Sequence, residues 1–297
     1  MKKDAGVNLA LGTVQFGLNY GVSNVSGKVS EPEVVKIINE ALRLKISTLD
    51  TAIVYGDSES VLGRIGVNDF DIVTKLPELP KNVTNLDAWV IDNVQESLKK
   101  LNVKKIYALL LHRSYDFMGE YGFKLYDILC KLRKDGVVSK LGVSIYSPIE
   151  LDRLEDSGIK IDILQTPFNV LDRRIETSGW LRKLKLSGVE IHARSVFLQG
   201  LLLQESKQRN QYFSKWKDHL DNFDEWVKKS NQTPLEACLN FVSSNSDVDK
   251  IVVGVENRDQ LMEIVLSIEN TSTLRVSDYL QTGDIQLIDP SNWKYFP

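Results

Sequence analysis

Eight short runs rich in β-branched residues and leucine recur along the chain, and they constrain its fold more than any other feature. Most of these runs are nearly continuous apolar stretches, which is typical of parallel strands buried on both faces of a sheet. We expect strands at residues 8–11, 47–50, 71–75, 106–112, 140–144, 161–165, 189–193 and 250–253.

Amphipathic helical patterns separate these runs. The segment Ser30-Glu31-Pro32-Glu33 reads as a capping box that begins a helix. Gly136 and Gly188 stand just beyond two further helical patterns, where glycine commonly ends a helix. The helical patterns cover residues 34–42, 89–101, 125–134, 181–186, 235–242 and 261–268.

This alternation, with no Pro-, Gly- or Ser-rich linker, predicts one (β/α)8 TIM barrel over residues 1–297 with its active site at the carboxyl ends of the strands. A doubly wound open sheet is the alternative, but the G-x-G-x-x-G turn that it would normally carry is absent. Two stretches exceed a minimal connection: residues 202–233, which are polar and aromatic, and the tail 271–297. We expect both to act as lids over the strand ends.

Composition excludes several classes of protein. Lys and Arg number 37 against 40 Asp and Glu, so no basic excess favours nucleic-acid binding. No window approaches the roughly 20 apolar residues of a membrane span, and no signal peptide is evident. We therefore expect a cytoplasmic protein without a membrane partner. We also expect a monomer or a weak homo-oligomer. The three histidines, His112, His192 and His219, show no metal-ligand spacing, so we expect no metal. Cys130 and Cys238 are expected to be free thiols.

Ionisable side chains end three successive predicted strands. Asp50, Lys75 and His112 occupy these positions, and Tyr55 follows five residues after Asp50. Each has an ordinary structural explanation by itself, but ionisable groups that end apolar strands are costly to bury together without a purpose. A neighbouring Lys75 would lower the phenol pKa of Tyr55 from its usual value of about 10. The set predicts proton donation to an oxygen that becomes negative as hydride reaches carbon.

These residues resemble the aldo-keto reductase family. The stretch L-G-T-V-Q-F-G at 11–17 is similar to the family's opening strand, and residues 50–63 match its D-T-A-x-x-Y-G-x-x-E-x-x-L-G signature. The resemblance continues through the later strand ends and spans about residues 8–268. It implies a barrel enzyme that uses NADPH or NADH, without a metal, and a catalytic set of Asp50, Tyr55, Lys75 and His112. Tyr55 would be the general acid, Lys75 would lower its pKa, Asp50 would pair with Lys75, and His112 would orient the carbonyl.

The resemblance also implies a cofactor site. Backbone at the first strand end would approach the nicotinamide ribose, polar side chains after strands five and six would bind the carboxamide, and the loop 195–201 would cover the pyrophosphate. The implied residues are Gly12, Thr13, Asp50, Ser144, Gln165, Asn169, Arg194, Ser195, Phe197, Gly200, Gly254, Val255, Glu256 and Gln260.

Three positions depart from the family's pattern. Arg194 stands where an aromatic residue often stacks on the nicotinamide, and its charge would disfavour the positively charged oxidised cofactor. Glu256 stands where a basic residue often meets the 2′-phosphate of NADPH, so NADH is favoured, although Arg258 could compensate. Ile264 replaces an asparagine that would contact the adenine.

Loops after strands one, four and seven, together with the C-terminal tail, would form the substrate site, and Phe168 follows strand six. Arg113 and Arg194, beside polar Gln15 and Asn19, indicate a small carbonyl substrate that is sugar-like or anionic. The resemblance to related sequences implies a place in carbohydrate metabolism. An aldehyde, ketone or keto-sugar would be reduced to the alcohol. Two alternatives are a nicotinamide-dependent sugar isomerase, epimerase or lyase, and a non-catalytic cofactor-sensing subunit. The implied substrate residues are Gln15, Tyr20, Arg113 and Phe168, with Tyr212, Phe213 and Trp216 from the lid.

Overall fold

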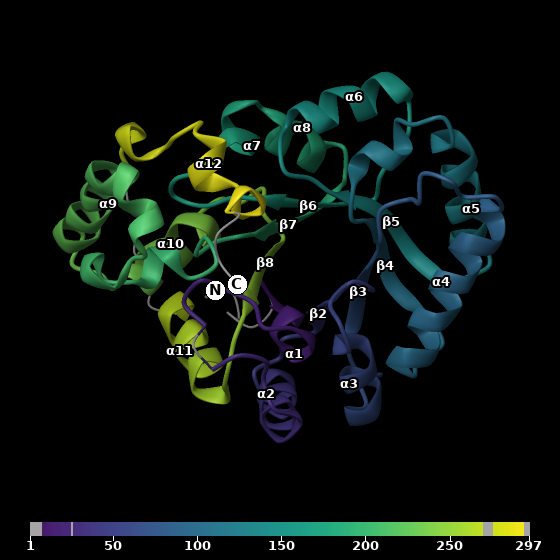
Figure 1. The fold of residues 1–297 in the computed structure, drawn as a ribbon, viewed down its shortest axis with the longest axis horizontal. Coiled ribbons are helices and arrows are strands. Elements are labelled where there is room, and N and C mark those ends of the chain that lie inside the picture. Colours follow the sequence, from purple (N-terminus) through teal and green to yellow (C-terminus); the bar gives the residue numbers. More distant parts are fainter. Residues whose placement is uncertain (1–7, 25, 270–275, 294–297) are drawn as a thin grey trace.

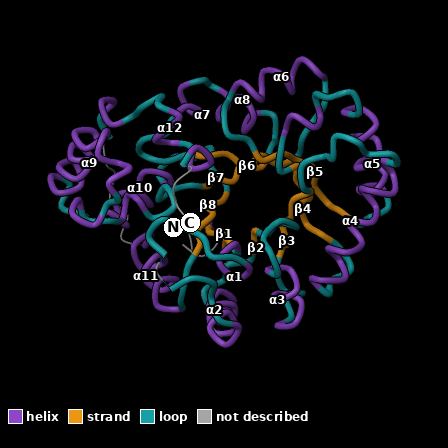
Figure 2. Tube along the Cα trace, viewed as in Figure 1, coloured by secondary structure: helices purple, strands orange, loops and turns teal. Residues whose placement is uncertain are grey.

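Eight parallel strands close into a barrel in the order β1-β2-β3-β4-β5-β6-β7-β8, surrounded by helices (Figures 1 and 2). The computed structural model describes residues 8–24, 26–269 and 276–293. The strands are β1 (Leu9–Gly12), β2 (Thr48–Asp50), β3 (Asp71–Leu76), β4 (Ile106–Leu111), β5 (Val138–Ser144), β6 (Ile163–Pro167), β7 (Glu190–Arg194) and β8 (Lys250–Gly254). The predicted barrel and all eight predicted strands are confirmed, and the open sheet is excluded.

Helices follow the strands around the barrel. They are α1 (Val14–Gly17), α2 (Glu31–Arg43), α3 (Ser58–Ile65), α4 (Leu86–Leu101), α5 (Gly122–Lys134), α6 (Ile149–Ser157), α7 (Arg174–Thr177), α8 (Trp180–Leu186), α9 (Lys217–Lys229), α10 (Pro234–Ser243), α11 (Arg258–Glu269) and α12 (Ile285–Ile288). The six predicted helical patterns coincide with α2, α4, α5, α8, α10 and α11. Gly136 and Gly188 have φ angles of 74° and 80°, as expected of glycines that end a helix.

Two apolar clusters stabilise the barrel, one inside it and one between its strands and the surrounding helices. Val73, Ala108, Leu110 and Ile163 form a small cluster of their own, while the outward-facing strand residues pack with the helices in one large core. Successive side chains of a strand point to opposite faces, so Lys75, two residues beyond Val73, faces the same interior nearer the carboxyl end. The apolar cluster therefore lies beneath the polar strand ends.

The predicted capping box at Ser30 is wrong. Ser30 does precede α2 with extended backbone, but its side chain makes no capping hydrogen bond. Glu33 instead pairs with Lys36 at 2.8 Å and accepts a hydrogen bond from the backbone N–H of Arg258 at 3.0 Å. The Glu33 carboxylate therefore joins α2 to the start of α11. This long-range contact takes the place of the capping hydrogen bond that was predicted within α2.

The stretch 202–233 folds into α9 and short 3₁₀ turns beside the barrel. These turns are η3 (Leu201–Leu203), η4 (Ser206–Gln208) and η5 (Gln211–Trp216). Phe213 is buried, and its ring centroid lies 4.9 Å from that of Trp293. Trp216 Nε1 donates a hydrogen bond of 2.7 Å to Asp284. The lid aromatics therefore pack against the C-terminal segment. Figure 1 shows this segment, in yellow, near α9.

That C-terminal segment is described for residues 276–293, which contain η6 (Asp278–Leu280), α12 and η7 (Pro290–Asn292). Residues 271–275 and 294–297 of the predicted tail lie outside the described residues. The backbone N–H of Thr282 donates a hydrogen bond of 2.9 Å to the carbonyl of Leu171, so the segment is also attached to the loop after β6.

Close approach of α3 to α4 gives a stability prediction. A Cβ added to Gly63 would lie 1.9 Å from the carbonyl oxygen of Lys100, so Gly63→Ala must push the two helices apart. We expect it to lower the free energy of unfolding by about 1–3 kcal/mol in a denaturant titration. Gly119→Ala is the control, because its Cβ would meet no atom closer than 3.9 Å. Equal stability of the two variants would contradict this packing.

Candidate active site

A cavity of about 630 Å³ lies at the carboxyl ends of the strands. Its size is within the range of about 300–1,000 Å³ that is usual for cofactor and ligand sites. The sequence-predicted residues that line it are Gly12, Thr13, Gln15, Tyr20, Asp50, Tyr55, His112, Ser144, Gln165, Arg194, Ser195, Phe197, Gly200, Gly254, Glu256 and Gln260. The fold thus brings most of the predicted site to one place.

Asp50 and Lys75 form a buried ion pair. Lys75 Nζ lies 2.9 Å from each Asp50 carboxylate oxygen and donates a third hydrogen bond of 2.7 Å to the Thr51 carbonyl. Gln165 Nε2 donates to the same carboxylate at 2.6 Å. All three N–H donors of the ammonium group are therefore used within the protein. Burial lowers the pKa of Lys75, and the Asp50 charge opposes that shift.

Tyr55 lies between this pair and His112. The rings of Tyr55 and His112 are edge to face with centroids 6.0 Å apart, and Lys75 Nζ lies 5.1 Å from the Tyr55 ring centroid. Burial and the Asp50 charge raise the pKa of Tyr55, while Arg194 lowers it. The expected lowering of this pKa by Lys75 is not found, because burial, and after it the Asp50 charge, raise the pKa. Tyr55 is therefore protonated at neutral pH.

His112 is neutral at physiological pH. Burial, and after it the charges of Lys75, Arg194 and Arg113, lower the pKa of His112 to about 4. One ring nitrogen of a neutral imidazole carries a proton and can donate a hydrogen bond. His112 can therefore orient an oxygen acceptor beside Tyr55 without carrying a charge itself.

The loop after β7 has an unusual backbone. Ser195, Leu198 and Gln199 have φ angles of 59°, 45° and 54°, in the left-handed region that costs about 1–3 kcal/mol for a residue other than glycine. Gly200, with φ of 90°, approaches Ser23 so closely that a Cβ would lie 1.9 Å from the serine Oγ. Strained backbone of this kind concentrates where a loop holds a ligand.

The same loop is joined to the loop after β1 across the cavity. The backbone N–H of Val22 donates to the Gln199 carbonyl at 3.1 Å, and Gln199 Nε2 donates to the Tyr20 hydroxyl at 3.1 Å. The contact keeps the two loops together over the strand ends.

The end of the cavity at α11 is acidic. Glu256, Gln260 and Glu263 line it, and burial raises the pKa of Glu256. Arg258 is turned away: its Nε donates to Glu40 at 3.0 Å, and Arg258 does not line the cavity. Arg194 is the single Lys or Arg among the described lining residues.

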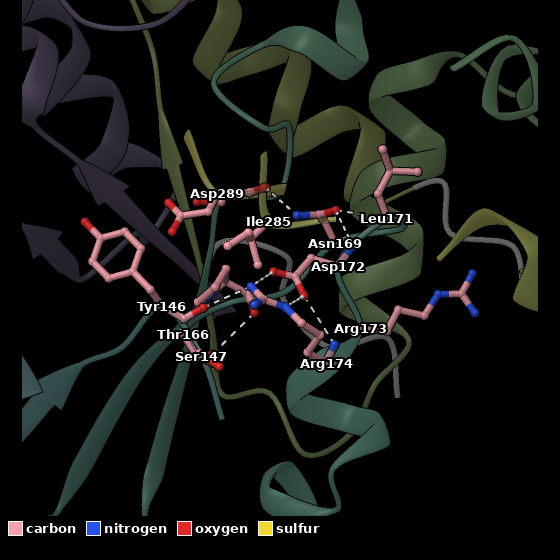
Figure 3. Close-up of polar contacts among 12 residues, drawn as sticks. Tyr146, Ser147, Thr166, Asn169, Leu171, Asp172, Arg173, Arg174, Ile285 and Asp289 are labelled. Carbon is pink, nitrogen blue, oxygen red and sulfur yellow. Dashed lines mark hydrogen bonds and ion pairs between the residues drawn. The ribbon is translucent and has the colours of Figure 1, made fainter. Parts of the chain in front are cut away.

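Asn169 and Val255 lie outside the cavity lining. The Asn169 side-chain oxygen accepts from the backbone N–H groups of Leu171 and Asp172, each at 2.9 Å (Figure 3). Its side-chain nitrogen donates to the Ser195 carbonyl at 3.0 Å. Its amide therefore stabilises the turn after β6. Val255 is buried in the core.

Two predicted substrate residues are likewise not brought into the cavity. Phe168 is fully buried, with its ring centroid 5.0 Å from that of Phe241, so packing beneath the loops explains it. Arg113 has a half-exposed side chain over the ring of Tyr146 and lies beside the lining rather than in it. The aromatic residues of the lid contact one another and do not line the cavity either.

Sequence reasoning missed Tyr146 and Glu263, which both line the cavity. Tyr146 comes two residues after Ser144, the last residue of β5, so its position after a strand was an available signal. Glu263 follows Gln260 by three residues on α11, and residues at that spacing share one helix face.

The cavity contains an unpartnered polar atom. Gln15 Oε1 is buried and accepts no hydrogen bond from the residues that the structure describes. It stands against Gly254, where a Cβ would lie 2.7 Å from this oxygen. Buried polar groups are normally hydrogen-bonded, so an orphan acceptor in a cavity indicates a ligand. The polar side chains of Ser144 and Gln165 line the same cavity, and the strands β1 and β8 end in the glycines Gly12 and Gly254. Together with the orphan acceptor, this lining fits a nicotinamide dinucleotide.

In the described ranges 8–24, 26–269 and 276–293, no group of three or more His, Cys, Asp or Glu side chains could hold a metal ion. None of the helices in those ranges combines the length and the apolar character needed to cross a membrane.

A model of the aldo/keto reductase family matches residues 8–280. L-Galactose dehydrogenase of Arabidopsis thaliana is 22% identical over 90% of this chain and 87% of that protein. Methylglyoxal reductase DkgA of Escherichia coli K12 is 26% identical over 84% of this chain and 90% of that protein. An aldo-keto reductase from Bacillus halodurans, solved in its holo form, aligns over 90% of this chain and 88% of that one with a TM-score of 0.70 and 22% identity.

Proposed function

Since the chain belongs to the aldo/keto reductase family, we propose that this oxidoreductase reduces a small carbonyl compound to an alcohol with hydride from NADH or NADPH. The observation that carries the proposal is the convergence of Asp50, Tyr55 and His112 in the lining of one cavity, with Lys75 buried outside the lining and paired with Asp50. The names of the relatives support a sugar-like or otherwise polar substrate in carbohydrate metabolism. L-Glyceraldehyde 3-phosphate reductase of Escherichia coli O157:H7, 21% identical over 96% of this chain and 94% of that protein, is a further example.

Tyr55 donates the proton in this mechanism. Because its pKa is raised, its hydroxyl is protonated at neutral pH and transfers the proton only when the carbonyl oxygen becomes negative. A reduced nicotinamide, when bound, supplies the hydride to the carbonyl carbon. Neutral His112 donates an N–H hydrogen bond to the same oxygen and orients it. Lys75, fixed by Asp50, lies with its Nζ 5.1 Å from the Tyr55 ring centroid. The Arg194 charge, which lowers the pKa of Tyr55, stabilises the phenolate until solvent returns the proton.

The other lining residues would hold the cofactor. Ser144 and Gln165 offer polar side chains to the carboxamide at the reaction end, and Gly12 leaves room at the end of β1. Thr13 would only shape the wall of the cavity, because its hydroxyl and its backbone N–H already donate to the Asp50 carbonyl, at 3.0 Å and 2.9 Å. The loop after β7 would cover the pyrophosphate, with its contact to the β1 loop keeping it in place.

The acidic end of the cavity favours NADH. A 2′-phosphate there would meet Glu256 and Glu263, while Arg258 is held by Glu40. A carboxylate at this position can instead accept a hydrogen bond from the ribose 2′-hydroxyl.

Glu256→Lys is expected to raise the ratio of NADPH affinity to NADH affinity by about tenfold or more, since it removes a repulsive charge and adds an attractive one. Dissociation constants from calorimetry measure this ratio. Glu120→Lys, at an exposed residue outside the lining, makes the same charge change and should leave the ratio unaltered. An unchanged ratio in Glu256→Lys would remove Glu256 from the ribose site.

A further inference from the structure

The reaction end of the cavity has one uncompensated charge. Asp50 and Lys75 cancel each other in their ion pair, and His112 is neutral because its pKa is about 4. Arg194 lines the same end and forms no ion pair with any residue that the structure describes. The net charge there is therefore positive, and it resides on the Arg194 guanidinium.

Two hydrogen bonds fix the Arg194 guanidinium and leave some of its N–H donors unused within the described residues. Its Nη2 donates to the Ile145 carbonyl at 2.8 Å and its Nη1 to Ser195 Oγ at 3.1 Å. A guanidinium has five N–H donors. Within the described residues two are used, so three remain for a ligand. The guanidinium carbon lies 4.5 Å from the ring centroid of Tyr146, and this ring fixes the plane of the group.

Tyr146 is itself anchored from behind. Arg174 Nη2 donates to the Tyr146 carbonyl at 2.9 Å and also to the buried carboxylate of Asp172 at 2.8 Å (Figure 3). Because Asp172 is fully buried and Arg174 lies between it and the loop after β5, the backbone of Tyr146 cannot shift easily. The aromatic support of Arg194 is thus preorganised.

A second arginine lies over the same ring. The guanidinium carbon of Arg113 is 5.3 Å from the Tyr146 ring centroid. Its carboxylate neighbour, Glu78, is 4.0 Å away, and both side chains are about half exposed or more, so that pair is weak. Both arginines lower the pKa of His112, which means that both act electrostatically on the group proposed to orient the carbonyl.

We propose that Arg194, supported by Tyr146 and reinforced by Arg113, binds an anionic group of the substrate, so that the enzyme selects carbonyl compounds bearing a carboxylate or phosphate. The inference rests on the proposed function, which leaves the charge of the substrate open. Guanidinium groups match carboxylate and phosphate oxygens with paired, charge-assisted hydrogen bonds. A guanidinium that stacks on a nicotinamide through its face still has its edge N–H groups for such an anion.

The test compares aldehydes of equal chain length at constant ionic strength. Glyoxylate is paired with glycolaldehyde, and glyceraldehyde 3-phosphate with glyceraldehyde. We expect kcat/KM to favour the anionic member of each pair by about tenfold or more, and Arg194→Gln to reduce that ratio by about tenfold. Arg194→Lys, which keeps the charge but loses the paired donors, should retain an intermediate ratio.

Arg153→Gln is the matched control. The Arg153 guanidinium lies 5.4 Å from the ring centroid of Tyr115, in a similar cation–π contact, but neither residue lines the cavity. In Arg153→Gln, the ratio of kcat/KM for the anionic aldehyde to kcat/KM for the neutral one should equal that of the unsubstituted enzyme. Equal kcat/KM for anionic and neutral aldehydes in the unsubstituted enzyme would overturn the inference. An equal loss of selectivity in Arg194→Gln and Arg153→Gln would also overturn it.

A binding measurement separates this inference from the proposed function. Calorimetric titration with glycolate and with ethylene glycol, with and without NADH, requires no turnover. If neither aldehyde of any pair is reduced, the proposed function fails. Tight glycolate binding that weakens in Arg194→Gln would still support the anion site, and no preference for glycolate over ethylene glycol would overturn it.

Discussion

Replacing Tyr55 by phenylalanine is expected to lower kcat for carbonyl reduction by about 10²–10⁴-fold while leaving NADH affinity within about twofold. The substitution removes the hydroxyl that protonates the carbonyl oxygen but keeps the ring, its edge-to-face contact with His112 and the shape of the cavity. Loss of nicotinamide absorbance under single-turnover conditions measures the rate, and calorimetry measures the affinity.

Tyr279→Phe removes a hydroxyl from an exposed tyrosine outside the cavity lining and should retain full activity. If Tyr55→Phe kept more than about a tenth of the rate, another group would have to donate the proton. If it lost cofactor affinity in proportion to its rate, the hydroxyl would contribute to binding rather than to proton transfer.

Lys75→Met is expected to reduce the free energy of unfolding by about 3–5 kcal/mol, because it leaves the Asp50 carboxylate buried without its cation. The double variant Asp50→Asn, Lys75→Met removes both charges and should recover much of that stability, while activity stays low in both. Denaturant titrations of the single and double variants give the two free energies.

Lys124→Met provides the control for a cation of the same type. Lys124 pairs with Asp87 at 2.8 Å, but both side chains are about half exposed, so its loss should cost less than about 1 kcal/mol. A Lys75→Met variant as stable as Lys124→Met would mean that the Asp50–Lys75 pair does not stabilise the barrel. No recovery in the double variant would mean that the cost comes from lost packing.

The strand ends were the most predictable part of the site. Asp50, Lys75 and His112 each end an apolar run, and parallel strands in a closed barrel bring all their carboxyl ends to one rim. Nothing more than strand identity is needed to bring these three side chains together, which is why their proximity could be predicted without knowledge of the loops.

Loop residues were less predictable, because a polar side chain after a strand can face a ligand or complete a turn. Asn169 completes the turn after β6, whereas Tyr146 after β5 faces the cavity. The choice depends on tertiary neighbours such as Arg174, whose guanidinium holds the loop of Tyr146. Sequence spacing does not contain that information.

The pKa of Tyr55 was also beyond the sequence. Proximity to Lys75 was predicted correctly, but the direction of the shift depends on burial and on the charge of Asp50. Both are properties of distances in the folded protein. The charge at the reaction end of the cavity likewise depends on the fold, because the close pairing of Asp50 with Lys75 leaves Arg194 as the uncompensated cation there.

Calorimetric titration of the purified protein with NADH and with NADPH tests the central claim, that this cavity holds a nicotinamide dinucleotide with its reactive end at Tyr55. We predict saturable binding at one site per chain, with NADH bound more tightly than NADPH and with Gln15→Leu weakening both, since Gln15 Oε1 is the orphan acceptor in the lining. Absence of binding by either nucleotide would contradict the account, because the complete catalytic set would then stand in a cavity that takes no hydride donor.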